Sequence, residues 1–162
     1  MSTRVAEPTT TRPRYDGKRA EPFAIDVKGA FFTVQTLAPL LADGAGVVLT
    51  TSVANRVGIV DSSVYAAGKA AVRSLARSLS RELLPRGIRV NAISPGPVDT
   101  GTLERTMPKE AADAFVAERV AANPMHRRGT PDEVAAAALF LAVDATYTAG
   151  VELVVDGGVT QL

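Results

Sequence analysis

Three short, β-branched apolar runs, separated by long helical segments, most constrain how this 162-residue chain can fold. The runs are Val47–Thr51, Ile88–Ile93 and Val151–Val155. Glycine or proline stands close to each of them, as is typical of buried strands. Strands that alternate with long helices pair in parallel, and the helices cover both faces of the sheet. We therefore predict an α/β fold with about three parallel strands.

The segments between these runs have the apolar spacing and end signals of helices. Helices are predicted at residues 23–41, from Ser62 or Ser63 to about 84, at about 109–122, and at 130–143. The first of these is expected to be mostly buried. Either serine can cap the second, which Pro85 and Gly87 end. Thr130 fits the N-cap of the last helix, and Glu133 completes a capping box.

Residues 1–21 differ from the rest of the chain. Their apolar side chains follow neither period 2 nor period 3.6, and threonine and proline are frequent. Such a segment is typical of a disordered or non-homologous extension. Residues 22–162 are therefore predicted to form the folded domain.

Composition excludes several classes of protein. With no cysteine and one histidine, the chain has no means of building disulfides, thiolate metal sites or multi-histidine metal sites. Eighteen Lys and Arg balance 17 Asp and Glu, so bulk charge favours neither nucleic acid nor a membrane surface. No stretch approaches the roughly 20 apolar residues that span a bilayer, and the N-terminus lacks the apolar segment of a signal peptide. We expect a cytoplasmic protein with no metal site and no nucleic-acid or membrane partner.

Tyr65 and Lys69 are the first candidates for chemistry. Four residues apart at the start of a predicted helix, they share one face, one turn apart. A phenol in water ionises only at about pH 10, and a neighbouring ammonium favours the phenolate. Such a tyrosine can exchange a proton with a substrate oxygen. Ser52 follows the first strand, at the edge where open parallel sheets bind ligands, and its hydroxyl can hold a substrate carbonyl.

The stretches around these residues form a series of motifs in a fixed order. They are TTSVANRVG at 50–58, VYAAGKAAVRSLARSLSREL at 64–83, RGIRVNAISPGPVDT at 86–100, RRGTPDEVA at 127–135 and VELVVDGG at 151–158. Together they resemble the classical short-chain dehydrogenase/reductase family over residues 22–162. The resemblance implies a partial Rossmann-like three-layer α/β fold. It also implies an NAD(P)-dependent oxidoreductase that transfers a hydride between nicotinamide and a small-molecule alcohol or ketone.

The resemblance further implies roles for single residues. Tyr65 would be the acid–base, Lys69 would assist it, both would contact the NAD or NADP coenzyme, and Ser52 would orient the substrate oxygen. The loop that touches the nicotinamide end and pyrophosphate would include Pro95, Gly96, Val98 and Thr100. Asp26 stands where the family usually has an asparagine that links the lysine to a relay water. A carboxylate there can accept a hydrogen bond from Lys69 or from water, but it cannot donate one.

One departure from the family is an absence. The thirteen glycines form neither G-x-x-x-G-x-G nor G-x-G-x-x-G, the turns that hold a coenzyme pyrophosphate at a helix N-terminus. We therefore expect a truncated member with weak or no activity alone, whose first strand has an open edge. The alternative is a non-catalytic pseudoenzyme or an interaction subunit that pairs with a full-length homologue. The helices at 22–42 and 62–84 would form that homo- or hetero-oligomer, as they usually do in the family.

Overall fold

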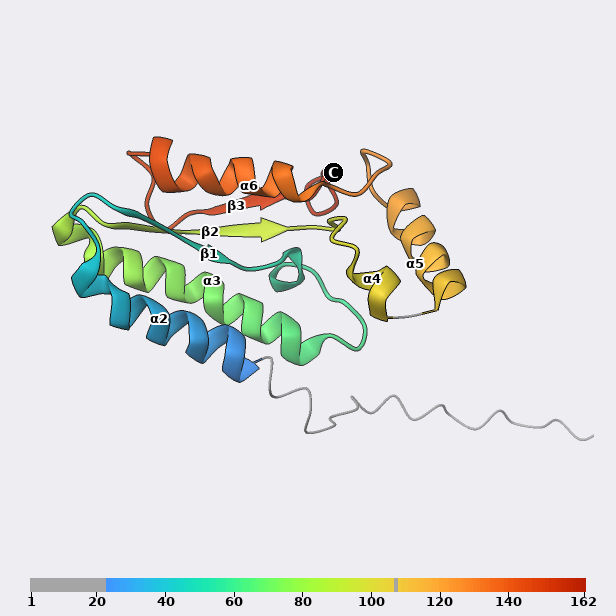
Figure 1. Ribbon diagram of the computed structural model, residues 1–162, viewed down its shortest axis with the longest axis horizontal. Coiled ribbons are helices and arrows are strands. Elements are labelled where there is room, and N and C mark those ends of the chain that lie inside the picture. The colour runs from blue at the N-terminus through green and yellow to red at the C-terminus, as the bar shows by residue number, and fades with distance from the viewer. Residues whose placement is uncertain (1–22, 107) are drawn as a thin grey trace, which may run out of the picture.

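The computed structural model describes residues 23–106 and 108–162 (Figure 1). The predicted extension at residues 1–21 lies outside them. The helices are α2 (Ala30–Leu37), α3 (Ser63–Leu83), α4 (Thr102–Thr106), α5 (Lys109–Ala121) and α6 (Pro131–Leu139), and the strands are β1 (Gly46–Thr50), β2 (Arg89–Pro95) and β3 (Glu152–Val155). Short π-helical or 3-10 turns flank them: η2 (Ala24–Gly29), η3 (Ala38–Leu40), η4 (Val53–Asn55), η5 (Leu84–Arg86) and η6 (Phe140–Asp144).

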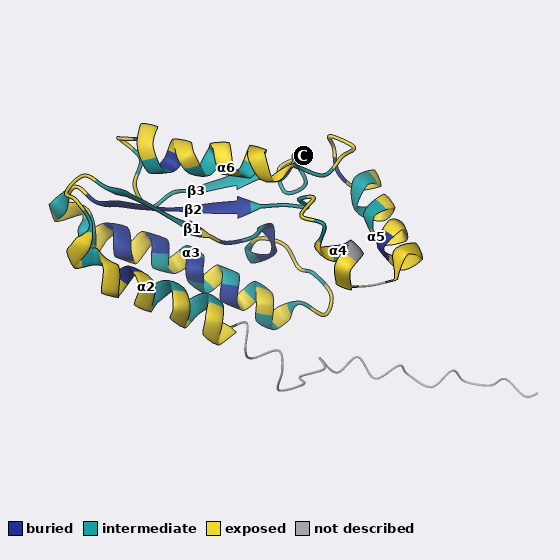
Figure 2. Cartoon of the chain, in the orientation of Figure 1, coloured by how far each residue is buried: buried dark blue, intermediate teal, exposed yellow. Residues whose placement is uncertain are grey.

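The three strands form one parallel sheet in the order β1-β2-β3. Leu49 of β1 pairs with Ala92 of β2, whose next residue, Ile93, pairs with Leu153 of β3. β2 is buried along almost its whole length, because it has a strand on each side and helices over both faces (Figure 2). The predicted parallel α/β sheet is therefore confirmed.

Two apolar clusters hold the three layers together. On one face, α2 and α3 pack against the sheet through a cluster that includes Val34, Val72 and Val90. On the other face, α6 and η6 pack through a cluster that includes Leu141 and Ile93. Val90 and Ile93 of β2 thus point to opposite faces of the sheet, because successive side chains of a strand alternate between its two faces.

The expectation that the first predicted helix is mostly buried is wrong. Within α2 only Val34 is buried, while Ile25 of η2 is 70% exposed and Leu40 of η3 is 80% exposed. The reason is geometric: this segment lies along α3 at the margin of the layer, so only one flank of it meets the core (Figure 1). The described residues contain nothing that covers its outer flank.

Of the predicted helix caps, the one at the start of α6 is confirmed, whereas the predicted serine cap of α3 makes no capping hydrogen bond. Thr130 and Glu133 form the predicted capping box, each side chain accepting a hydrogen bond from the other residue's backbone N–H. Ser62 occupies the N-cap of α3, but it makes no capping hydrogen bond. Its hydroxyl donates instead to the carbonyl oxygen of Val60 at 3.3 Å. Gly87 ends the α3 segment with a φ of 70°, which a side chain would disfavour.

The carboxyl ends of the strands point to one edge of the sheet, where the connections into η4 and α4 begin (Figure 1). In the part of the chain that the structure describes, β1 has β2 as its only strand neighbour. Across residues 23–106 and 108–162, no helix combines the length and the apolar character that a bilayer crossing needs.

Candidate active site

Ser52 stands two residues after the end of β1, where the chain turns into η4. Its backbone is extended, and its hydroxyl oxygen accepts a hydrogen bond from the backbone N–H of Ala54 at 3.2 Å. That bond leaves the hydroxyl proton free to point toward a ligand oxygen. The fold therefore holds the Ser52 hydroxyl at the carboxyl edge of the sheet, as predicted.

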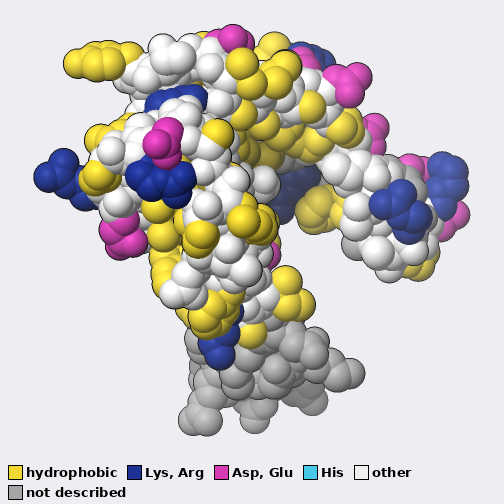
Figure 3. Space-filling view, turned by 60° about the vertical axis from the view of Figure 1, so that its left-hand side comes forward, with side chains coloured by type: hydrophobic (Ala, Val, Ile, Leu, Met, Phe, Trp, Pro, Cys, Tyr) yellow, Lys and Arg dark blue, Asp and Glu magenta, His cyan; other side chains and the backbone are white. Residues whose placement is uncertain are grey.

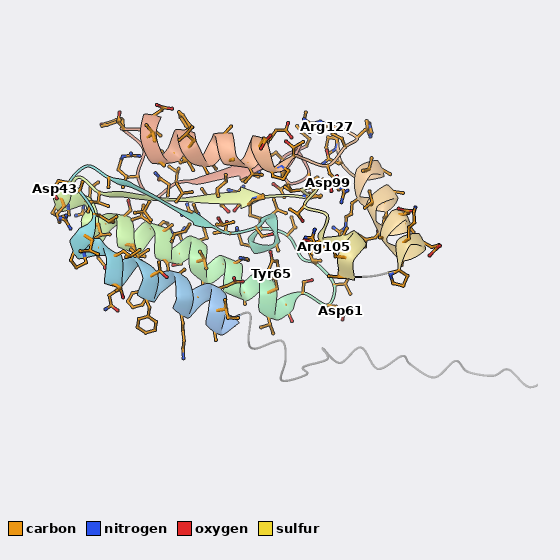
Figure 4. All side chains as sticks on the ribbon, in the orientation of Figure 1. Asp43, Asp61, Tyr65, Asp99, Arg105 and Arg127 are labelled. Carbon is orange, nitrogen blue, oxygen red and sulfur yellow. The ribbon has the colours of Figure 1, made fainter. Side chains whose placement is uncertain are left out.

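Tyr65 and Lys69 lie one turn apart in the first half of α3, and Figure 4 labels Tyr65 on that helix. The Lys69 ammonium lies 5.5 Å from the centre of the Tyr65 ring. The same nitrogen lies 3.3 Å from Oδ2 of Asp26 in η2. The side chains of Lys69 and Asp26 are only 12% and 28% exposed, so this ion pair is partly shielded from water.

A cavity of about 450 Å³ brings the predicted residues together at the carboxyl edge. Its lining includes seven of them: Ser52, Tyr65, Lys69, Pro95, Gly96, Val98 and Thr100. Asp26 is the exception, because it reaches the cavity only through its ion pair with Lys69. The lining thus joins several hydroxyl groups and one ammonium to an apolar wall that also includes Pro131 and Val134.

The loop after β2 forms one wall of this cavity and is held firmly. The backbone N–H of Gly96 donates to Val155 at 2.9 Å, and Val98 pairs with Gly129 in an isolated parallel bridge. Close packing against Asp156 also explains why residue 96 is a glycine. A Cβ there would lie 2.6 Å from Cβ of Asp156, which is closer than carbon atoms tolerate.

A second cavity of about 360 Å³ adjoins the first and shares Ser52 and Gly96 with it. It extends toward α4 and α5, and Figure 3 shows a hollow between the body of the molecule and an outlying lobe. Phe115, Arg119 and Arg128 line it; Arg128 lies in the RRGTPDEVA motif, whereas sequence analysis did not find Phe115 and Arg119. The only sequence signal was the spacing of Phe115 and Arg119, whose guanidinium lies 4.9 Å from the ring centre.

Charge in this second cavity is partly compensated. Arg128 forms an ion pair of 2.8 Å with Asp99, and the Arg128 side chain is 15% exposed. Figure 4 labels Asp99 and Arg105 beyond the carboxyl end of β2. A cavity with an apolar lining and a few polar groups is the usual form of a small-molecule site.

The residues present fit one end of a nicotinamide coenzyme. Apolar Pro95 and Val98 can face a flat ring, while Lys69 and Tyr65 can bind ribose hydroxyls. The sequence contains no Gly-rich turn of the kind that holds a coenzyme pyrophosphate at a helix N-terminus. The described residues also contain no group of three or more His, Cys, Asp or Glu side chains suited to a metal ion.

A parallel α/β sheet with a ligand cavity at its carboxyl edge defines a Rossmann-like domain. A family model described as enoyl-(acyl carrier protein) reductase matches residues 13–160. The chain belongs to the short-chain dehydrogenase/reductase family of oxidoreductases.

Relatives of known sequence and structure agree with this assignment. The chain is 38% identical over 143 residues to "Oxidoreductase asL5" of Sarocladium schorii, covering 86% of this chain and 56% of the relative. It is 37% identical over 143 residues to "Inactive 2-(S)-hydroxypropyl-CoM dehydrogenase 2" of Xanthobacter autotrophicus, covering 86% and 62%. A small-chain dehydrogenase crystallised in complex with NADPH matches with a TM-score of 0.82 and 30% identity, covering 90% and 65%. The chain thus spans somewhat more than half the length of these proteins.

Proposed function

We propose that this chain carries the acid–base site of an NAD(P)-dependent oxidoreductase that interconverts an alcohol and a ketone. The observation that carries the proposal is the convergence of Ser52, Tyr65 and Lys69 on one cavity at the carboxyl edge of the sheet. The resemblance of the surrounding motifs to the short-chain dehydrogenase/reductase family supports the same roles.

When bound, the nicotinamide coenzyme supplies or receives the hydride. In reduction, Ser52 donates a hydrogen bond to the ketone oxygen, and Tyr65 gives that oxygen its phenolic proton as negative charge develops. The Lys69 ammonium, 5.5 Å from the ring centre, stabilises the phenolate that remains. Solvent then returns a proton to Tyr65. In oxidation, each of these proton transfers runs in reverse.

Thermal unfolding of the full chain, with and without NADH or NADPH, tests coenzyme binding. A ligand present at 100 times its dissociation constant stabilises the folded state by about 2.7 kcal/mol. Because these 162 residues contain no Gly-rich pyrophosphate turn, we expect millimolar concentrations to be needed. The melting temperature should rise with one of the two nucleotides.

Ketone-dependent oxidation of the preferred nucleotide tests the chemistry. Tyr65→Phe should abolish turnover and leave the melting temperature nearly unchanged, because the Tyr65 side chain is 42% exposed. Tyr147→Phe is the matched control, since Tyr147 is fully exposed and does not line the cavity. Equal turnover by wild type and Tyr65→Phe would contradict the proposed role.

A second candidate function is that of a non-catalytic interaction subunit. The exposed apolar flank along η2, α2 and η3 favours it, since surfaces of this kind mark protein–protein contacts. Its members are Ile25, Phe32, Leu37 and Leu40. One relative is itself named an inactive dehydrogenase, which supports the idea that the family includes such chains.

Sedimentation of the purified chain, alone and mixed with a full-length homologue, separates the two functions. An interaction subunit should associate through the exposed flank, and Ile25→Glu with Leu40→Glu should abolish the association. A monomer that oxidises NADH or NADPH in the presence of a ketone would refute this second candidate.

A further inference from the structure

A buried carboxylate lies in β3, in a strand whose neighbouring residues are apolar. The side chain of Glu152 is only 6% exposed. An isolated carboxylate at that depth is costly, so its partners must compensate its charge. Within the described residues, no buried side-chain nitrogen or oxygen is left without a hydrogen bond.

Four side chains from three other elements converge on Glu152. Its Oε1 accepts hydrogen bonds from Oγ of Ser94 at 2.5 Å and from Nδ2 of Asn55 at 2.6 Å. Its Oε2 lies 2.9 Å from both Nε and Nη2 of Arg56, and 3.5 Å from Nε of Arg73. Burial alone would raise the pKa of Glu152, but the hydrogen bonds from Ser94, Asn55 and Arg56, with the Arg56 charge, hold it below its ordinary value.

Two of these partners connect Glu152 to the loop that carries Ser52. The Nδ2 group of Asn55 also donates to the backbone carbonyl of Ser52 at 2.7 Å. Ser94 directly precedes the Pro95–Gly96 wall of the cavity, and its hydroxyl is hydrogen-bonded to that of Thr51. One carboxylate therefore joins the connections that leave β1 and β2.

Arg73 connects the same carboxylate to the helix that carries Tyr65 and Lys69. The three residues are spaced four apart in α3, so they lie along one face of that helix. Arg73 also donates to the carbonyl oxygen of Gly150, just before β3, at 3.0 Å. Through one or two contacts, Glu152 thus reaches the loop after β1, the end of β2 and α3, which are three of the segments that line the cavity.

We infer that Glu152 is a positioning residue, which holds the Ser52 loop, the Pro95–Gly96 loop and the Tyr65 face of α3 in their relative places. The catalytic roles of Ser52 and Tyr65 rest on the proposed function. The contacts by which Glu152 joins the two loops to α3 do not depend on that function. The length of the Glu152 side chain lets Oε1 bind the two loops, and its negative charge lets Oε2 bind the two arginines.

Hydrogen exchange measured by NMR on the full chain tests this link without requiring turnover. The reporter is the backbone N–H of Ala54, which donates to the Ser52 hydroxyl, and the reference is the buried helix residue Leu79. In Glu152→Ala, exchange at Ala54 should accelerate about tenfold more than at Leu79, the effect of losing a hydrogen bond to a charged group. Glu152→Gln, which keeps an oxygen for Ser94 and Asn55, should restore most of the protection.

Glu152→Asp keeps the test decisive if Glu152→Ala does not fold. It retains the charge for the arginines but is one methylene too short to reach Asn55 and Ser94, so Ala54 should again exchange about tenfold faster. Glu82→Gln, an exposed carboxylate on α3, is the matched control and should change neither reporter.

Equal acceleration at Ala54 and Leu79 in these variants would overturn the inference and leave Glu152 a general stability residue. The proposed function fails separately. If the wild type shows neither coenzyme binding nor turnover, the exchange measurements still decide whether Glu152 positions the loop. If the wild type is catalytically active, kcat should fall in those Glu152 variants in which Ala54 loses protection from hydrogen exchange.

Discussion

The ammonium of Lys69 lies 3.3 Å from the carboxylate of Asp26, at the position where the family resemblance implies an asparagine. The contact joins η2 to α3 beside the cavity, so the Lys69 ammonium lies close both to this carboxylate and to the Tyr65 ring. A carboxylate so close to the ammonium weakens its electrostatic effect on a phenolate.

Replacing Asp26 by asparagine should therefore increase Tyr65-dependent turnover. Even an exposed ion pair is worth up to about 1 kcal/mol, and a change of that size in the barrier corresponds to an increase of about fivefold. The measurement is kcat for ketone-dependent oxidation of the preferred nucleotide in Asp26→Asn and wild type.

Asp43→Asn is the matched control for this change. It removes an ion pair with Arg86 at the opposite end of the sheet, where Figure 4 labels Asp43. Its kcat should equal that of the wild type. A kcat that falls in Asp26→Asn would mean that the carboxylate assists the site instead of opposing it.

The elements of this fold were predictable because their signals are local. The predicted strand Val47–Thr51 is observed as Gly46–Thr50, and the last predicted strand loses one residue to become Glu152–Val155. The capping box at Thr130 fixed the start of α6 for the same reason. Apolar runs and caps depend on neighbouring residues, and these are present in the sequence itself.

What the sequence did not reveal depends on distant partners. Glu152 looked like one polar residue in an apolar strand, since nothing local connects it to Asn55 or Arg73. The exposed flank of α2 was missed because periodicity shows that a face is apolar, but not whether another element covers it. Sequence analysis found residues of the two cavities only inside the motifs that resemble the family. Phe115 and Arg119 lie outside these motifs.

Gly96→Ala should destabilise the chain in the absence of any coenzyme. The new Cβ would lie 2.6 Å from Cβ and 2.8 Å from Cα of Asp156, both within the backbone turn after β3. Overpacking of this kind costs about 1–3 kcal/mol. Thermal or urea unfolding of the coenzyme-free chain measures it.

Gly29→Ala provides the contrasting substitution. A Cβ at Gly29 meets nothing within 4 Å, and alanine favours helix over glycine by about 1 kcal/mol. Gly29→Ala should therefore be neutral or stabilising. Equal stability of the two variants would show that Gly96 is not required by packing.

Glu133→Gln should lower stability at neutral pH and have progressively less effect in acid. Hydrogen bonds from Arg127 and from the backbone of Thr130 lower the pKa of Glu133 to about 2, from 4.5. A carboxylate whose pKa falls on folding contributes stability above its unfolded value, and this contribution disappears as the pH drops through the folded value. The difference in melting temperature from wild type should be constant above about pH 5, should shrink as the pH falls toward about 2, and should vanish below that value.

Glu118→Gln is the control for this pH series, because Glu118 is an exposed carboxylate in α5. Its difference from wild type should stay small at every pH. A Glu133→Gln difference that persists unchanged to pH 2 would mean that the charge of Glu133 does not act through Arg127.

Arg89→Met should strongly destabilise the chain. Arg89 is buried at the start of β2, and its guanidinium donates to the carbonyl oxygens of Leu141, Ala142 and Ala145, each at 2.9 Å. These carbonyls belong to the C-terminal end of the α6–η6 segment, where a positive charge is favourable.

In Arg89→Met, the methionine side chain fills a similar volume but leaves three acceptors unpaired. The loss should be about 3 kcal/mol or more, or roughly 10 °C in melting temperature for a chain of this size. Arg81→Met, at an exposed position of α3, should melt with the wild type, and an Arg89→Met protein that does the same would show that water replaces the guanidinium at this helix end.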